Sequence, residues 1–494
     1  MERLVISKDK RRLVTESGKP FFWLADTVWT MPTRLKWDDA LCLMDKRVQQ
    51  GFTVLQIVAL DPEFDEGIHS PNGEPALFDM KLEQRNEKYF EYLDWLISEA
   101  ERRGLYVLLL PIWGQMVVGE NWMRRQFDKT MHSGNAYEYG QWLGRRYKDR
   151  ANIIWCLGGD RHPIHRGVNY KDVWRRLAEG IGNGVTGKDL RWNVPDEDWG
   201  RALMTYHPCY EAETGEHSTM SYWNDEDVWI DFIMNQSGHN PSVLSYQRIK
   251  TDYDRERTMP VFDGEPAYEK MPSGWPGDFP RYDEWMVRKR AYWSLFAGSF
   301  GHTYGHACIW CTISEKDLSK GQPYTWFQSL DHPGAWQMRV MKDFMESRPY
   351  WRLVPCQELI GHDQCCGGEC LDDHRQACMD SEGTFAFVYL TSGGRETVDL
   401  SRLKAEKLNC WWFNPRNGEC VTPDGQPTQV PTIIENTHTW MHFQSPDCGE
   451  KMDWILVLED AASGKGAPGR PLAEMMEACR EPEREAEKVF DFGV

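Results

Sequence analysis

Apolar segments of strand length alternate with segments of helical spacing over the first 350 residues. Continuous apolar runs such as Thr53–Leu60 and Leu105–Pro111 are typical of strands in a parallel sheet that is covered on both faces. In residues 37–50 and 86–103 apolar side chains recur at helical spacing, and a glycine follows each segment. The whole pattern predicts strands at 21–26, 53–60, 105–111, 153–160, 202–207, 230–236, 260–265 and 302–310. It predicts helices at 37–50, 86–103, 137–148, 170–180, 242–253, 284–297 and 336–345.

Eight such alternations predict an α/β fold, a (β/α)₈ TIM barrel with right-handed crossovers. An open doubly wound sheet is the second choice. It would require a glycine-rich phosphate turn after the first strand, and the segment Asp26–Trp29 does not resemble one. In the barrel, Asp160 ends the fourth strand and Glu265 the seventh, so both are expected at the carboxyl end, where these barrels carry active sites.

The pattern changes after about residue 349. Short apolar runs at 385–390, 408–413, 440–443 and 454–458 are separated by turns rich in Gly, Pro, Asn and Asp. Short strands without intervening helices predict a small all-β sandwich. We therefore expect a (β/α)₈ barrel domain over 1–349, a β-sandwich domain over 350–460, and a flexible charged tail over 461–494.

The charge and composition of the chain argue against some classes of binding partner. A formal net charge of −19 argues against nucleic acid, which needs a basic face, and against an anionic membrane surface. No stretch approaches the roughly 20 apolar residues of a membrane span. The first residues lack a signal-peptide pattern, so we expect a cytoplasmic protein. The 14 cysteines then fit free thiols in a reducing compartment. The composition is compatible with a homo-oligomer.

Two groups of cysteines are candidate metal sites. Cys308 and Cys311 form a C-x-x-C motif inside an apolar segment without a second pair, which favours packing. A stronger candidate for a zinc site is the cluster of Cys365, Cys366, Cys370, His374 and Cys378, although its spacing matches no standard zinc site. We expect no metal and no cofactor, and keep a zinc-dependent hydrolase that uses this cluster as an alternative.

Two strand ends carry the candidate chemistry. Residues 153–160 and 260–266 each run from apolar sequence into glycine and then a carboxylate, Asp160 and Glu265. Glycines there let a ligand approach the backbone closely. Two carboxyl groups that face each other across a pocket are what cleavage of a glycosidic bond requires. The plainer interpretation is that both acids cap strand ends or pair with arginines.

The neighbouring residues suggest a role for each acid. The apolar strand before Asp160 predicts that burial keeps this carboxyl group protonated, as a general acid must be. Glu265 must be ionised to attack, with hydrogen-bond donors such as His207, Gln236 or Tyr304. Asp263 is the rival nucleophile because it shares a strand face with Glu265, but its deeper position favours a supporting role.

Sugar binding is expected to use aromatic and polar side chains near strand ends. Trp29, Trp113 and Trp310 each follow a predicted strand and suit the apolar face of a sugar, although each would equally suit packing at the rim. Asp26 either binds sugar hydroxyls or caps a turn. The substrate-binding candidates are therefore Asp26, Trp29, Trp113, His207, Gln236, His239, Tyr304 and Trp310.

At this point the sequence resembles a known family. The segments Gly18–Trp29, Gly158–Asp160, Gln236–His239 and Asp263–Glu269 look like those of the apiosidase-like glycoside hydrolases, in family order, and the resemblance covers roughly residues 10 to 460. It implies a (β/α)₈ barrel followed by a β-sandwich that has been labelled collagen-binding. It also implies a retaining mechanism with Asp160 as acid/base and Glu265 as nucleophile.

The resemblance has two departures. The segment Tyr206–Glu213 differs from the serine- and glycine-rich stretch of the family, which puts the leaving-group side in question, and the run Cys365–Cys378 resembles an insertion in the sandwich. We expect a retaining, exo-acting glycosidase on plant-derived oligosaccharides or glycosides, apiosidase-like or a related pentosidase. The alternative is a non-catalytic carbohydrate-binding barrel whose sandwich recognises the ligand.

Overall fold

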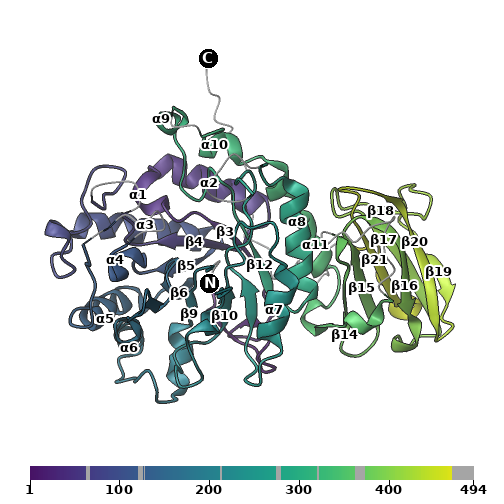
Figure 1. The fold of residues 1–494 in the computed structure, drawn as a ribbon, viewed down its shortest axis with the longest axis horizontal. Helices are drawn as coiled ribbons and strands as arrows, with labels where there is room; N and C mark the ends of the chain where they lie inside the picture. The colour runs from purple at the N-terminus through teal and green to yellow at the C-terminus, as the bar shows by residue number, and fades with distance from the viewer. Residues whose placement is uncertain are drawn as a thin grey trace.

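The computed structural model shows two folded domains side by side (Figure 1), with the N-terminal domain in purple to green and the C-terminal domain in green to yellow. The residues that it describes are 1–62, 67–120, 126, 128–211, 214–273, 280–319, 322–361 and 373–469.

The N-terminal domain contains the predicted barrel. In the described residues, eight parallel strands form one sheet in the order β10-β11-β12-β3-β4-β5-β6-β9. The two strands at the ends of this order are β10 and β9. Just before β10, the Asp231 backbone N–H donates to the carbonyl of Met204, the first residue of β9, over 2.9 Å. The bounds are β3 (Trp23–Thr27), β4 (Val54–Val58), β5 (Tyr106–Leu110), β6 (Ile153–Gly158), β9 (Met204–His207), β10 (Ile233–Asn235), β11 (Val261–Asp263) and β12 (Gly301–Tyr304). The predicted α/β barrel is confirmed, with Asp160 after the fourth strand and Glu265 after the seventh.

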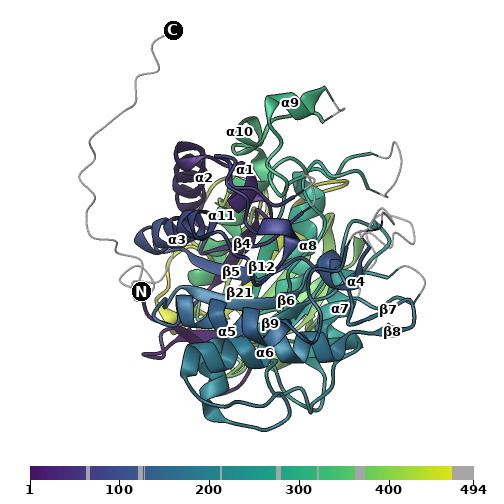
Figure 2. The same cartoon turned by 90° about the vertical axis from the view of Figure 1, so that its left-hand side faces the viewer.

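Helices cover the outside of the barrel, and Figure 2 shows α5 and α6 side by side on that surface. The long helices are α2 (Trp37–Gln49), α3 (Glu87–Arg102), α5 (Ala136–Tyr147), α6 (Lys171–Thr186), α7 (Ser245–Tyr253), α8 (Glu284–Phe296) and α11 (Pro333–Glu346). Short ones are α1 (Met31–Arg34), α4 (Gln115–Val118), α9 (Glu315–Leu318) and α10 (Trp326–Ser329). Two hairpins, β1 (Leu4–Ile6) with β2 (Leu13–Thr15) and β7 (Ile164–His165) with β8 (Val168–Asn169), complete the domain. All seven predicted helices are present.

Aromatic side chains fill the barrel interior. The ring of Trp23 on β3 lies 5.1 Å from that of Phe262 and 5.9 Å from that of Phe300. Side chains alternate along a strand, so Trp23 and Ala25 point inward while Leu24 and Asp26 point toward the helices. This packing closes the interior around the strand starts and leaves the carboxyl end for polar side chains.

The C-terminal domain consists of antiparallel strands, as predicted. One sheet has the order β13-β14-β15-β21-β17-β18 with β19 beside β17, and β16 pairs with β20 in a second sheet. Apolar side chains of both sheets share one core. The bounds are β13 (Leu353–Pro355), β14 (Gln376–Asp380), β15 (Phe385–Leu390), β16 (Gly393–Asp399), β17 (Lys407–Phe413), β18 (Cys420–Val421), β19 (Thr432–Glu435), β20 (Trp440–Cys448) and β21 (Trp454–Asp460).

Helices α8 and α11 join the two domains. The rings of Tyr292 and Tyr389 stack at 5.1 Å, and Phe344 of α11 lies 4.6 Å from Phe413 of the sandwich. Arg288 and Asp453 form an ion pair across this interface, with 2.7 Å between Nη2 and Oδ1, and both side chains are almost fully buried. Aromatic contacts and a buried charge pair therefore fix the sandwich to the barrel.

The buried pair makes the Arg288→Ala variant informative. Removing the guanidinium group leaves the Asp453 carboxylate buried with less compensation, so we expect a loss of about 3–5 kcal/mol in the free energy of unfolding. Urea unfolding followed by tryptophan fluorescence measures it. The control is Lys407→Ala, which breaks an exposed pair with Glu435 and is expected to cost less than about 1 kcal/mol. Equal losses in the two variants would contradict the structural role of the buried pair.

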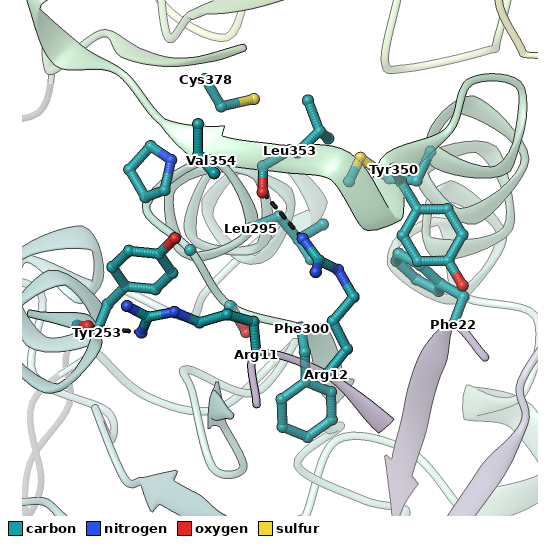
Figure 3. A pocket seen from close by; sticks show the side chains of 14 residues that line it. Arg11, Arg12, Phe22, Tyr253, Leu295, Phe300, Tyr350, Leu353, Val354 and Cys378 are labelled. Carbon is teal, nitrogen blue, oxygen red and sulfur yellow. Dashed lines mark hydrogen bonds between the residues drawn. The ribbon is translucent and has the colours of Figure 1, made fainter. Parts of the chain in front are cut away.

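A small cavity lies at the domain junction, well apart from the strand ends that carry the candidate chemistry. Figure 3 shows Arg11 reaching the Tyr253 carbonyl (2.7 Å) and Arg12 reaching the Leu353 carbonyl (3.0 Å). Its volume of about 20 Å³ is enough for roughly one water molecule. None of the predicted site residues lines it.

The first part of the expected tail is packed against the folded domains. Ala467 is buried, and the Gly466 carbonyl accepts a hydrogen bond from Arg348 over 2.8 Å. Residues 461–469 therefore differ from the flexible segment that the sequence predicts, because a buried arginine and the sandwich core hold them. The remaining tail, 470–494, lies outside the described residues.

Candidate active site

The chain leaves β6 through an unusual turn. Gly158, Gly159 and Asp160 all have positive φ, at 90°, 88° and 56°. A Cβ at Gly158 would lie 2.3 Å from the His207 carbonyl oxygen, and one at Gly159 would lie 2.9 Å from the Trp113 ring. The glycines are thus needed for the turn and its packing. Asp160 adopts a strained conformation of the kind that clusters at functional sites.

The carboxyl group of Asp160 is held by two donors. The Gln236 side-chain amide donates to Oδ1 over 3.0 Å, and Arg161 donates to Oδ2 over 3.2 Å. The side chain is 19% exposed. These polar neighbours replace the apolar surroundings that the preceding strand suggested, and they orient the carboxyl group with one face toward solvent.

Glu265 follows the end of β11, and its backbone is fixed on both sides. Its carbonyl accepts from the Gly238 N–H over 2.9 Å, and the Gln56 side chain donates to the preceding Gly264 carbonyl over 3.0 Å. The Glu265 side chain is 11% exposed. Gln56 is absent from the sequence-based candidates, although a single glutamine on the inward face of an apolar strand is a usable signal.

One histidine connects the two acids. The Asp160 backbone N–H donates to Nδ1 of His207 over 3.0 Å, and Nε2 of the same ring lies 2.8 Å from Oε2 of Glu265. A backbone N–H only donates, so Nδ1 is the unprotonated nitrogen, and Nε2, which lies close to Glu265, carries the ring hydrogen. His207, fully buried, thereby ties the turn after β6 to the carboxylate after β11.

Histidines also set the charge of Glu265. Burial raises the pKa of this carboxyl group, but its contacts with His207 and His239 outweigh burial and hold the pKa well below its ordinary value. Nε2 of His239 lies 3.6 Å from Oε1. Glu265 is therefore ionised across the whole neutral and mildly acidic range.

Asp263, the rival nucleophile, lies deeper. It is fully buried, and Ser237 donates to it from its hydroxyl (2.6 Å) and its N–H (3.3 Å). Burial raises the pKa of Asp263 to about 6, against the effect of the Ser237 bonds. This closed carboxyl group is hydrogen-bonded to the segment that precedes Gly238, whose N–H binds the Glu265 carbonyl.

Aromatic rings surround His207. Trp29 and Trp113 lie 5.3 and 5.8 Å from its ring and 5.4 Å from each other. Both indoles are largely buried, while Trp310 is half-buried beside the same barrel cluster. Tyr268, which the sequence-based list omits, packs edge-on against His239 at 4.6 Å. Burial and the negative charge of Glu265 raise the pKa of its hydroxyl group. Trp29, Trp113, His207, Gln236 and His239 thus gather with the two acids.

Two predicted binding residues lie elsewhere. Asp26 is fully buried and pairs with Arg47 of α2, with 2.6 Å between Oδ2 and Nε. The Tyr304 hydroxyl donates to Glu269 over 2.6 Å, so it does not reach Glu265. Asp26 and Tyr304 are paired in register on β3 and β12, and their side chains share the outer face of the sheet. The structure therefore separates both from the candidate site.

The candidate metal ligands are placed only in part. Cys365, Cys366 and Cys370 lie outside the described residues. The His374 ring stacks on Tyr246 at 3.5 Å, and Cys378 is buried in the core between barrel and sandwich. The described part of the chain holds no group of three or more His, Cys, Asp or Glu side chains arranged to bind a metal ion. Cys308 and Cys311 pack with Ala307 and Ile313.

No helix among the described residues combines the length and apolarity of a membrane span.

Comparisons with known proteins agree with this geometry. Residues 7–352 match the family model "Apiosidase-like, catalytic domain", and residues 354–459 match "Putative collagen-binding domain of a collagenase". The search of curated proteins found no match.

Two solved structures are similar over nearly the whole chain. A glycoside hydrolase family 5 protein from Bacteroides vulgatus is 29% identical, with a TM-score of 0.80, over 96% of this chain and 97% of that one. A second, described as a glycoside hydrolase, is 28% identical with a TM-score of 0.79, over 94% and 98%. The family model covers more than half of the chain and includes both acids. This protein therefore belongs to the apiosidase-like family, and it is a glycosidase.

Proposed function

We propose that the protein is a retaining glycosidase in which Glu265 is the nucleophile and Asp160 the acid/base. The observation that carries this assignment is the single His207 ring between the backbone of Asp160 and the carboxylate of Glu265. This ring supports a site in which both partly exposed carboxyl groups act on one bond.

The reaction then proceeds in two displacements. Glu265 attacks the anomeric carbon and forms a glycosyl ester, while Asp160 gives its proton to the departing glycosidic oxygen. Asp160, now ionised, removes a proton from water, the water oxygen bonds to the anomeric carbon, and the Glu265 carboxylate is released. The histidines that keep Glu265 ionised prepare it both as nucleophile and as leaving group.

The proposed substrate is a terminal pentose on a plant-derived oligosaccharide or small glycoside, and the enzyme acts from the chain end. The family description supports a branched pentose such as apiose. The low exposure of both carboxyl groups supports a terminal sugar, because an internal sugar requires an open groove. A cytoplasmic location, which we also propose, would supply imported oligosaccharides or glycosides as substrates.

A screen of nitrophenyl glycosides together with branched-pentose pectin fragments tests this function. We expect turnover of one or a few pentosides and little of hexosides. Turnover confined to hexosides would refute the pentosidase proposal and leave the glycosidase assignment intact.

His207→Phe tests how Glu265 is kept ionised. This variant retains a ring of similar size but loses the donor to Glu265, so the pKa of Glu265 is expected to rise. Because the ionised form is the nucleophile, activity should then fall at a higher pH on the acidic side. We expect the acidic limb of the kcat/KM profile to move up by about one pH unit or more. The unfolding transition serves as the control, and an unmoved limb in a folded variant would contradict this role.

A further inference from the structure

The segment after β9, which departs from the family pattern, lies beside Asp160. Gln236 donates to Asp160 Oδ1 over 3.0 Å and accepts a hydrogen bond from the Tyr210 backbone N–H with its own Oε1. Glu211 follows directly and accepts from the Tyr222 hydroxyl over 3.0 Å. A short chain of contacts thus runs from the proposed acid to a half-buried carboxylate that the mechanism does not use.

His162 completes this group of residues. It lies two positions after Asp160, and its ring is 4.6 Å from that of Tyr222. The side chain is 2% exposed, and its Nε2 atom has no hydrogen-bond partner among the described residues. In either tautomer this buried nitrogen is left unsatisfied, which is costly unless a ligand hydroxyl group pairs with it.

The acceptors of this group define what it binds. Oε2 of Glu211 already accepts from the hydroxyl groups of Tyr222 and Thr214, which, among the described residues, leaves Oε1 of Glu211 and Nε2 of His162 for a ligand. Sugar hydroxyl groups pair with such atoms, and an unsubstituted aromatic aglycone has no group that does. The group is attached to the acid/base side of the site, since its contacts lead to Asp160, whereas Glu265 is held by His207 and His239.

We propose that Glu211, His162 and Tyr222 form the leaving-group subsite of this enzyme, and that it selects a neutral sugar over an aromatic aglycone. The inference rests on the proposed function, because the acid/base protonates the leaving oxygen and groups beside it face the leaving group.

The test compares two substrates with the same pentose, a disaccharide with a neutral sugar as leaving group and the nitrophenyl glycoside. In Glu211→Ala we expect kcat/KM for the disaccharide to fall by a factor roughly 10- to 100-fold greater than for the nitrophenyl glycoside. Tyr222→Phe, which removes only the hydroxyl that holds Glu211, should show the same bias to a smaller extent. This second variant keeps the test valid if Glu211→Ala folds poorly.

Glu216→Gln is the matched control, because it removes a charge from the same loop while its backbone carbonyl still binds the Glu211 N–H. We expect equal, small effects on both substrates in this variant. Equal losses on both substrates in Glu211→Ala and Tyr222→Phe would overturn the subsite while leaving the proposed function standing. A wild-type enzyme that cleaves neither substrate nor any other glycoside would instead overturn the proposed function, and the subsite with it.

Discussion

Glu265→Ala is expected to lower kcat by a factor on the order of 10³ or more, with the protein still folded. Without this carboxylate no glycosyl ester forms, and neither His207 nor His239 replaces it as a nucleophile. The backbone contacts that fix the loop, from Gly238 and Gln56, do not involve the Glu265 side chain and should persist. Steady-state kinetics on the best substrate, with circular dichroism for folding, measure the effect.

Asp263→Asn is the control for this experiment. It changes a carboxyl group two residues away on the same chain segment, which is fully buried and bound by Ser237. We expect it to retain far more activity than Glu265→Ala. If a folded Asp263→Asn variant were inactive while Glu265→Ala kept near-normal turnover, the two residues would have to exchange roles.

Asp160→Ala should show a loss that depends on the leaving group. For an oligosaccharide, whose departing oxygen needs a proton, we expect kcat/KM to fall by about 10²- to 10⁴-fold. A dinitrophenyl leaving group departs without protonation, so the loss of kcat/KM there should be much smaller.

Asp196→Ala is a suitable comparison, since this exposed carboxylate caps a short helical turn far from the acids in sequence. It should leave the leaving-group dependence unchanged. Equal losses for both leaving groups in Asp160→Ala would show that Asp160 maintains the structure of the turn and is not the acid.

The barrel and its two acids could be predicted from the sequence because one physical signal marks them. A continuous apolar run is required for a strand that is buried on both faces, and a carboxylate directly after such a run must lie at the carboxyl end of the sheet. Asp160 and Glu265 satisfy this rule. The same reasoning places Trp29, Trp113 and His207 around them.

Side-chain direction near strand ends was the main source of error. Asp26 and Tyr304 lie at the ends of β3 and β12 on the outer face of the sheet, where Arg47 and Glu269 bind them. The alternation of side chains distinguishes the two faces only when the inward register is known, and Trp23 and Ala25 define it here. Gln56 was missed for the converse reason, as a polar residue inside the barrel.

Long-range contacts explain the remaining differences. The sequence does not reveal that Gly158 and Gly159 pack against His207 and Trp113, because those neighbours come from other strands. Five strands of the described sandwich, β13, β14, β16, β18 and β19, also escaped prediction. Gly393 and Gly394 begin β16 with positive φ beside a shift in pairing register.

Mass spectrometry of a trapped intermediate tests the central assignment most directly. The enzyme would be incubated with the 2-deoxy-2-fluoro glycoside of its preferred sugar carrying a dinitrophenyl leaving group, then digested and mapped. We predict one added fluorosugar per chain, attached through an ester to Glu265. Attachment to Asp263 or Asp160, or turnover of natural substrate with inversion at the anomeric carbon and no adduct, would contradict the account.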